Sequence, residues 1–176
     1  FRKKGIEVLL LAEPIDEWLM GQLREYQEHA LVDITRGALE LSELGDSEDL
    51  KPAEQLLEEN KALVERLSAV LVDQVSEVRA TQRLTDSPAC LVLGEYDIGE
   101  QMRKIMAASG QAVPESKPVL EVNPEHPLII RLSGESADEG FSELGHLLFD
   151  QAALAEGRQL ADPGAFVQRM NRLLIE

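Results

Sequence analysis

Ser142, His146 and Asp150 are the residues of this chain whose types could together perform nucleophilic chemistry. A serine nucleophile, a histidine base and an orienting carboxylate hydrolyse esters and amides when they meet as a catalytic triad. The four-residue spacing instead predicts one stripe of neighbours along a single helix. A triad also needs an oxyanion hole, which a regular helix does not offer. Solvated polar positions are the favoured interpretation, and a small hydrolase is the alternative.

The other potentially reactive side chains are isolated in the sequence. His29, His126 and His146 are widely separated, and the single cysteine completes no metal-ligand cluster with them. Cys90 lies in the apolar run 89–93, which predicts a small core residue rather than a nucleophile. Neither a glycine-rich dinucleotide loop nor a P-loop occurs. The sequence therefore predicts no catalytic, cofactor-binding or metal-binding residue in this chain.

The most clearly patterned stretch is the last third of the chain. Apolar residues recur at helical spacing from Phe141, and after a break at 156–158 the pair Asp162-Pro163 opens a second helix. Asp is a good N-cap, and Pro suits the first helical position. Two short antiparallel helices cannot bury both apolar faces against each other. Either the rest of the domain or a second copy of the chain must cover them.

Pairing two such helical hairpins about a two-fold axis gives a four-helix bundle, which is the simplest way to cover these faces. We therefore predict a dimerisation element at the C-terminal end. Its expected interface residues are Leu144, Leu147, Leu148, Leu154, Phe166, Val167, Met170, Leu173 and Leu174.

The first part of the chain has the pattern of an α/β segment. The continuous apolar run 6–11 predicts a strand buried on both faces, Pro14 opens a short helix, and 30–35 is a second strand candidate. Trp18 on this helix is expected to be a core aromatic. Residues 37–51 are acidic and rich in turn formers, so we place a domain boundary there, with one domain over 1–45 and a second over 46–176.

The second domain is predicted to be α+β with a small three-stranded sheet. Pro52 opens a long amphipathic helix. Residues 75–84 alternate as a half-exposed strand, and 89–93 form a buried strand that we expect to pair with it antiparallel. Residues 119–122 supply the third strand. The stretch 128–130 fits either a short helix or a strand, and the helix is favoured, followed by a polar loop over 133–140.

Ile98, Met102, Ile105 and Met106 form one stripe of a further helix, which Gly110 ends. Ordinary core packing explains such a stripe. Alternatively, the two methionines provide a soft surface for varied apolar partners, because their side chains can re-pack.

Composition limits the partners of this chain. It has 176 residues, is 44% hydrophobic and carries a net charge of −16, which argues against nucleic acid and anionic membranes. No run approaches the ~20 apolar residues of a membrane span. A single cysteine favours a reducing compartment and hence the cytoplasm. The chain does not begin with Met, so we expect it to be a fragment of a longer protein.

Several separated motifs resemble the heat-shock protein 90 chaperones, most closely their bacterial form. Those of the family's C-terminal domain are RLTDSPA at 83–89, LEVNPEH at 120–126 and RMNRLL at 169–174. KGIEVLL at 4–10 and IDEW at 15–18 resemble the end of its middle domain. The resemblance covers essentially the whole chain, in the family's order.

The resemblance implies a homodimeric, ATP-driven chaperone that assists the folding of non-native proteins, its clients. ATP and Mg²⁺ would bind an N-terminal domain that lies outside this chain, so this fragment itself is expected neither to bind nor to hydrolyse ATP. The heat-shock protein 70 system is an implied partner of the whole protein. A purely structural dimerisation module is the alternative.

The resemblance also changes the interpretation of two apolar groups. Trp18 and the methionine stripe become an exposed client surface rather than core, consistent with the general role of exposed apolar patches. The client-binding residues that it implies are Glu17, Trp18, Ile98, Met102, Ile105 and Met106.

Overall fold

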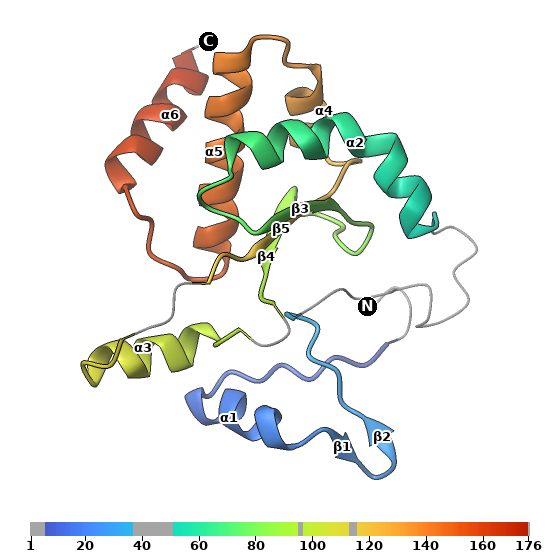
Figure 1. Cartoon of the computed structure of the whole chain (residues 1–176), viewed down its shortest axis with the longest axis vertical. Helices are drawn as coiled ribbons and strands as arrows, with labels where there is room; N and C mark the ends of the chain where they lie inside the picture. The colour runs from blue at the N-terminus through green and yellow to red at the C-terminus, as the bar shows by residue number, and fades with distance from the viewer. Residues whose placement is uncertain (1–5, 37–50, 95–96, 113–115, 176) are drawn as a thin grey trace. The chain divides into compact units, whose positions relative to one another are not determined.

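The computed structural model describes residues 6–36, 51–94, 97–112 and 116–175. These residues form six helices and two small sheets, of two and three strands, which confirms the predicted α+β class (Figure 1). Contacts divide the chain into two compact units. Unit 1 is Phe1–Ser47 with Leu93–Ser116, and unit 2 is Glu48–Val92 with Lys117–Glu176. The predicted boundary segment lies almost entirely outside the described residues, so the division into domains at 45/46 stays a prediction.

Unit 1 contains two short helices and a small hairpin. Its elements are α1 (Pro14–Gln22), β1 (Glu25–Tyr26), β2 (His29–Ala30) and α3 (Glu100–Ala108). Helix α1 begins as predicted, with Pro14 in its first turn and the Asp16 carboxylate accepting the Glu13 N–H at 2.9 Å. The hairpin turns at Gln27 and Glu28, both with positive φ.

Both strands predicted for this part of the chain are wrong. Residues 6–11 form no strand with any described residue, and Leu10 is 90% exposed. Of 30–35 only Ala30 belongs to a strand. A continuous apolar run indicates a strand covered on both faces, but strands also require hydrogen-bonded neighbours. The described part of unit 1 supplies no neighbour for this run.

Helix α3 starts later than its apolar stripe suggested. Gly99 is its N-cap, so Ile98 precedes the helix and is not on the stripe with Met102, Ile105 and Met106. The helix ends as predicted at Gly110, whose φ is +71°. The N–H of Gly110 donates to Ala107 O, and the N–H of Gln111 donates to Met106 O, the two bonds of a Schellman cap.

Unit 2 combines four helices with the three-stranded sheet. Its elements in chain order are α2 (Ala53–Val70), β3 (Glu77–Ala80), β4 (Ala89–Val92), β5 (Val119–Val122), α4 (Pro127–Gly134), α5 (Asp138–Ala155) and α6 (Pro163–Ile175).

The sheet of unit 2 has the order β3-β5-β4, with β5 parallel to β3 and antiparallel to β4. The predicted direct pairing of the strands at 75–84 and 89–93 is therefore wrong, although all three strands exist. Strands β4 and β5 are each buried at three of their four positions, whereas β3 begins at the exposed Glu77 and forms an edge. Burial therefore identifies β3 as less covered but does not decide which of the other two strands is central.

Helices α2 and α5 pack against the sheet and against each other (Figure 1). The core between them contains Leu67, Leu120 and Phe141, each at most 2% exposed. Gly145 of α5 lies against α2, where a Cβ atom would meet Leu67 Cδ2 at 3.3 Å. Its missing side chain lets the two helices approach closely. The long amphipathic helix predicted after Pro52 is thus confirmed as a packing helix.

Helix α4 settles the stretch that fitted either a helix or a strand. The His126 Nδ1 accepts the N–H of Leu128 at 3.1 Å, Pro127 occupies the first turn, and Ile129 and Leu132 are buried three residues apart. The helix interpretation is confirmed. The polar loop expected over 133–140 is shorter than predicted, because α4 continues to Gly134 and α5 begins at Asp138.

Both terminal helices form as predicted, and their caps are well defined. Gly157 has φ +75° and ends α5 through a Schellman cap, with the Arg158 N–H bonded to Ala153 O. The Asp162 carboxylate accepts the N–H of Ala165 at 2.9 Å and so caps α6. The predicted break and the predicted second start are confirmed.

Candidate functional site

The three residues with hydrolase character do not form a triad. His146 Nδ1 lies 2.8 Å from Gln74 Oε1, and Asp150 instead bonds Arg169 at 3.1 Å. Burial, aided by the nearby Arg169 charge, lowers the pKa of His146, while burial raises the pKa of Asp150. His146 and Asp150 therefore each contact a residue outside α5 rather than each other. No group of three His, Cys, Asp or Glu residues suited to a metal ion occurs in the described residues.

These contacts belong to a polar network that joins α6 to α5. Arg169 Nη1 lies 3.1 Å from Asp150 Oδ2, and Arg172 Nη2 lies 2.8 Å from Glu143 Oε2. The cations come from α6 and the carboxylates from α5. Polar side chains of α6 are thus directed at α5. Much of the apolar stripe of α6 therefore stays uncovered.

No residue of α6 is buried in the single chain. Val167 is 53% and Leu174 is 77% exposed, two helical turns apart on the same side of the helix. Phe166, Met170 and Leu173 are half-buried. We call these five residues the α6 stripe.

The predicted interface residues of α5 lie in three different environments. Leu147 and Leu148 are buried within unit 2, Leu144 is half-buried against the core, and Leu154 is exposed. The rest of the domain therefore covers most of the apolar face of α5. The sequence left open whether the rest of the domain or a second copy of the chain covers the terminal helices. The rest of the domain covers α5 but does not cover α6.

Unit 1 brings the two predicted client-binding groups together, because α1 contacts α3. Trp18 on α1 is 58% exposed, and Ile105 on α3 is 52% exposed. Met102 and Met106 are half-buried, as is Ile98 before the helix. Glu17 belongs to α1 beside Trp18. We call the exposed apolar positions of these two helices, Ile15, Trp18, Leu19 and Ile105, the α1–α3 surface.

The most unusual charged group of unit 2 is a carboxylate that the sequence did not single out. Glu121 is 3% exposed, although it is ionisable. The strand register places Arg79 and Cys90 directly beside it, one on each neighbouring strand. Glu121 Oε1 lies 3.0 Å from Arg79 Nε, and Oε2 is paired with Arg83. Two arginines thus stabilise one buried charge.

Cys90 is not a buried core residue, contrary to the prediction. Its Sγ lies 3.2 Å from Arg83 Nη2 and 4.0 Å from Glu121 Oε2, and the residue is half-buried. Burial raises the pKa of the thiol, and the Arg83 charge opposes that effect. The protonated thiol is a weak nucleophile, so the expectation of an unreactive cysteine still follows, for a different reason.

Comparison with known families gives a match over the full length of the chain. The family model described as Hsp90 protein matches residues 1–176. The chain belongs to the Hsp90 family. The resemblance drawn from the separated motifs is therefore confirmed at the level of the family, and the chain is a member of a chaperone family.

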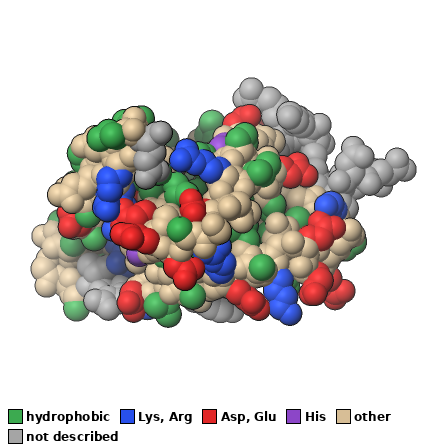
Figure 2. Space-filling model, turned by 90° about the horizontal axis from the view of Figure 1, so that it is seen from above, with side chains coloured by type: hydrophobic (Ala, Val, Ile, Leu, Met, Phe, Trp, Pro, Cys, Tyr) green, Lys and Arg blue, Asp and Glu red, His purple; other side chains and the backbone are tan. Residues whose placement is uncertain are grey.

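Two further observations concern the helices and the surface of this Hsp90 chain. Across the described ranges, no helix has the length and apolar character required to cross a bilayer. Figure 2 shows one face, on which acidic and basic side chains are interspersed among hydrophobic ones.

Proposed function

We propose that this chain is the part of an ATP-dependent, bacterial, cytoplasmic Hsp90 chaperone that forms the homodimer and contacts non-native clients. Family membership supports the chaperone role. The exposed apolar groups on the two units support the two more specific roles, one for each unit.

The observation that carries the client role is the contact of α1 with α3 in unit 1. It joins Trp18 and Ile105, both more than half exposed, in one pair of neighbouring helices. Large apolar side chains left in water commonly mark an interaction site. Met102 and Met106 lie on α3 beside them and can adapt to clients of different shape. Unfolded proteins expose apolar segments of no fixed sequence, which suits such a surface.

The observation that supports the dimer is the uncovered α6 stripe. A second copy would cover it by packing α6 and the exposed Leu154 of α5 against their counterparts, as in a four-helix bundle. Leu147 and Leu148 would support this contact from beneath. A dimer holds two client surfaces together and so strengthens individually weak contacts.

Other roles belong to the whole protein by this proposal. ATP and Mg²⁺ would act on a nucleotide domain outside this chain, and the chain by itself would not hydrolyse ATP. Cooperation with the heat-shock protein 70 system would likewise belong to the complete chaperone.

The test of the client role is suppression of the aggregation of a heat-denatured protein, followed by light scattering. The double variant Trp18→Ser, Ile105→Ser should lose most of the suppression, since it removes exposed apolar area without opening a core. Tyr26→Ser is the matched control, because Tyr26 is 60% exposed in the same unit but belongs to β1. Suppression by the double variant equal to that of the wild type would favour a purely structural dimerisation module.

A further inference from the structure

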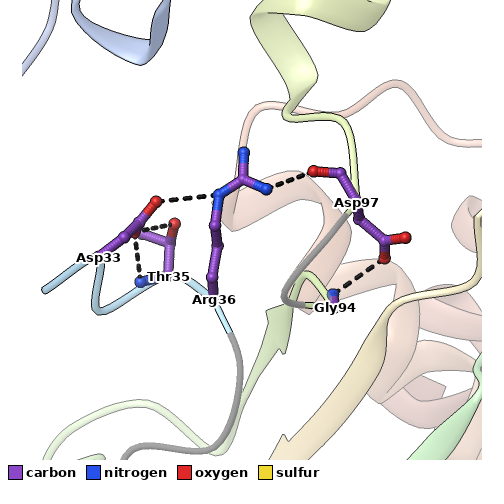
Figure 3. Close-up of polar contacts among 5 residues, drawn as sticks. All are labelled: Asp33, Thr35, Arg36, Gly94 and Asp97. Carbon is purple, nitrogen blue, oxygen red and sulfur yellow. Dashed lines mark hydrogen bonds and ion pairs between the residues drawn. The ribbon is translucent and has the colours of Figure 1, made fainter. Parts of the chain in front are cut away.

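Two segments of unit 1 that are far apart in the sequence are joined by one arginine. Arg36 Nε lies 3.0 Å from Asp33 Oδ2, and Arg36 Nη1 donates to the carbonyl oxygen of Asp97 (Figure 3). The guanidinium thus connects the segment after β2 with the turn before α3. The backbone adds to this connection, because the Leu93 N–H donates to Thr35 O at 3.2 Å.

Each side of this connection is itself fixed by local hydrogen bonds. Asp33 Oδ1 accepts the N–H of Thr35 at 2.9 Å and its hydroxyl at 2.6 Å, which orients the carboxylate that meets Arg36. On the other side, Asp97 Oδ2 accepts the Gly94 N–H at 2.9 Å and closes the turn (Figure 3). The arginine therefore bridges two preformed turns.

Asp97 is held in its charged form. A hydrogen bond with Ser116, together with the Gly94 N–H and the positive charges of Arg36 and Arg103, lowers the pKa of this carboxyl. The turn that presents the carbonyl to Arg36 therefore keeps its closing bond at neutral pH.

The bridge lies close to both helices of the α1–α3 surface. Only Ile98 and Gly99 separate Asp97 from the first residue of α3, so the start of the helix stays within about 10 Å of the bridge. The other end follows the hairpin that continues from α1. A shift at the bridge would move α3 relative to α1.

We propose that Arg36 is a positioning residue for the α1–α3 surface: by joining Asp33 to the turn at Asp97, it holds α3 beside α1 with Trp18 and Ile105 available together. This inference rests on the proposed client role. Arg36 does not itself touch the client, and it acts through the placement of α3.

The first measurement is structural and independent of any client. Trp18 is the only tryptophan of the chain, so its fluorescence reports one position. A nitroxide attached to Ala108→Cys on α3, in a Cys90→Ala background, quenches Trp18 according to their separation. We expect Arg36→Ala to reduce this quenching and Arg36→Lys, which keeps the charge but not the planar fork, to reduce it less. Arg24→Ala, at an exposed arginine of the same unit, is the control with equal loss of charge.

The second measurement is binding of a permanently unfolded, reduced and alkylated protein to the same variants. Arg36→Ala should raise the dissociation constant for this unfolded protein about fivefold, which is at the lower end of the changes in affinity that coupling between two sites typically causes. Arg24→Ala should leave the dissociation constant unchanged. Quenching that is the same in Arg36→Ala and wild type would overturn the inference, and so would altered quenching with unaltered binding. Failure of the wild-type chain to bind the unfolded protein would instead overturn the proposed client role.

Discussion

Glu121 on β5 lies directly opposite Arg79 on β3, with its Oε1 3.0 Å from the Arg79 Nε. Arg83 pairs with the second carboxylate oxygen, and Glu121 is almost completely shielded from water. Removing one member of such a group leaves the partner charges in a poorly solvated place. Loss of the Glu121 charge should therefore destabilise the sheet.

We expect Glu121→Gln to lower the free energy of unfolding of unit 2 by about 3 kcal/mol, the usual cost of breaking a buried ion pair. Urea unfolding followed by far-UV circular dichroism measures the change, since most of the helix belongs to unit 2. Glu77→Gln, an exposed glutamate of the neighbouring strand, is the matched control. Equal urea midpoints for the two variants would show that the buried pair contributes nothing.

The helices of this chain could be predicted from the sequence because their signals are local. Pro14 and Asp162 each mark a helix start, and Gly110 and Gly157 mark ends. The partners of a strand depend on residues far along the chain. The pattern of β5 showed that it was a strand but not that it lies between the other two. Glu121 was missed for the same reason, since a glutamate between apolar neighbours in a strand usually points to water.

The proposed surfaces could be predicted only in part. The spacing of Met102, Ile105 and Met106 predicted an apolar stripe, but it did not predict whether the stripe is exposed. An apolar stripe that packs on a core has the same period as one that binds a partner. The apolar run 6–11 shows the opposite problem. Its composition predicted burial, whereas Leu10 is nearly fully exposed among the described residues. Exposure depends on what covers a face, and that is a tertiary property.

His146 should make the stability of unit 2 dependent on pH. Because its pKa is lowered in the folded chain, the folded state keeps the imidazole neutral at pH values where the unfolded chain, with a pKa near 6.5, binds a proton. The free energy of unfolding should therefore fall as the pH drops below about 6.5. His146→Gln, which can still bond Gln74, should reduce this fall. An NMR titration of the His146 ring with a midpoint at or above 6.5 would contradict the prediction.

A side chain at Gly157 should destabilise the chain for conformational reasons alone. A Cβ there would meet nothing within 4 Å, but the residue has φ +75°. Gly157→Ala should therefore cost about 1 kcal/mol of stability. Gly134→Ala is the control, because Gly134 also has open space around it but no positive φ. A thermal melt in which both variants unfold at the wild-type temperature would show that the cap of α5 is not strained by alanine.

The α6 stripe should hold two copies of the chain together. By light scattering after size exclusion, the wild type should have a mass near twice 19.5 kDa at micromolar concentration. Val167→Asp with Leu174→Asp places two charges in the proposed interface and should raise the dissociation constant at least about a hundredfold. These positions are more than half exposed in the single chain, so the fold of unit 2 should persist.

The same two charges placed elsewhere on α6 test whether position or charge matters. Gln168→Asp with Asn171→Asp changes exposed polar residues of that helix and should leave the dimer intact. A chain ending at Ala161 lacks α6 and should be monomeric. If the wild-type chain is itself monomeric at micromolar concentration, a second copy does not cover the α6 stripe, and the proposed dimer is wrong. If both double variants dissociate equally, added charge rather than the apolar stripe controls assembly.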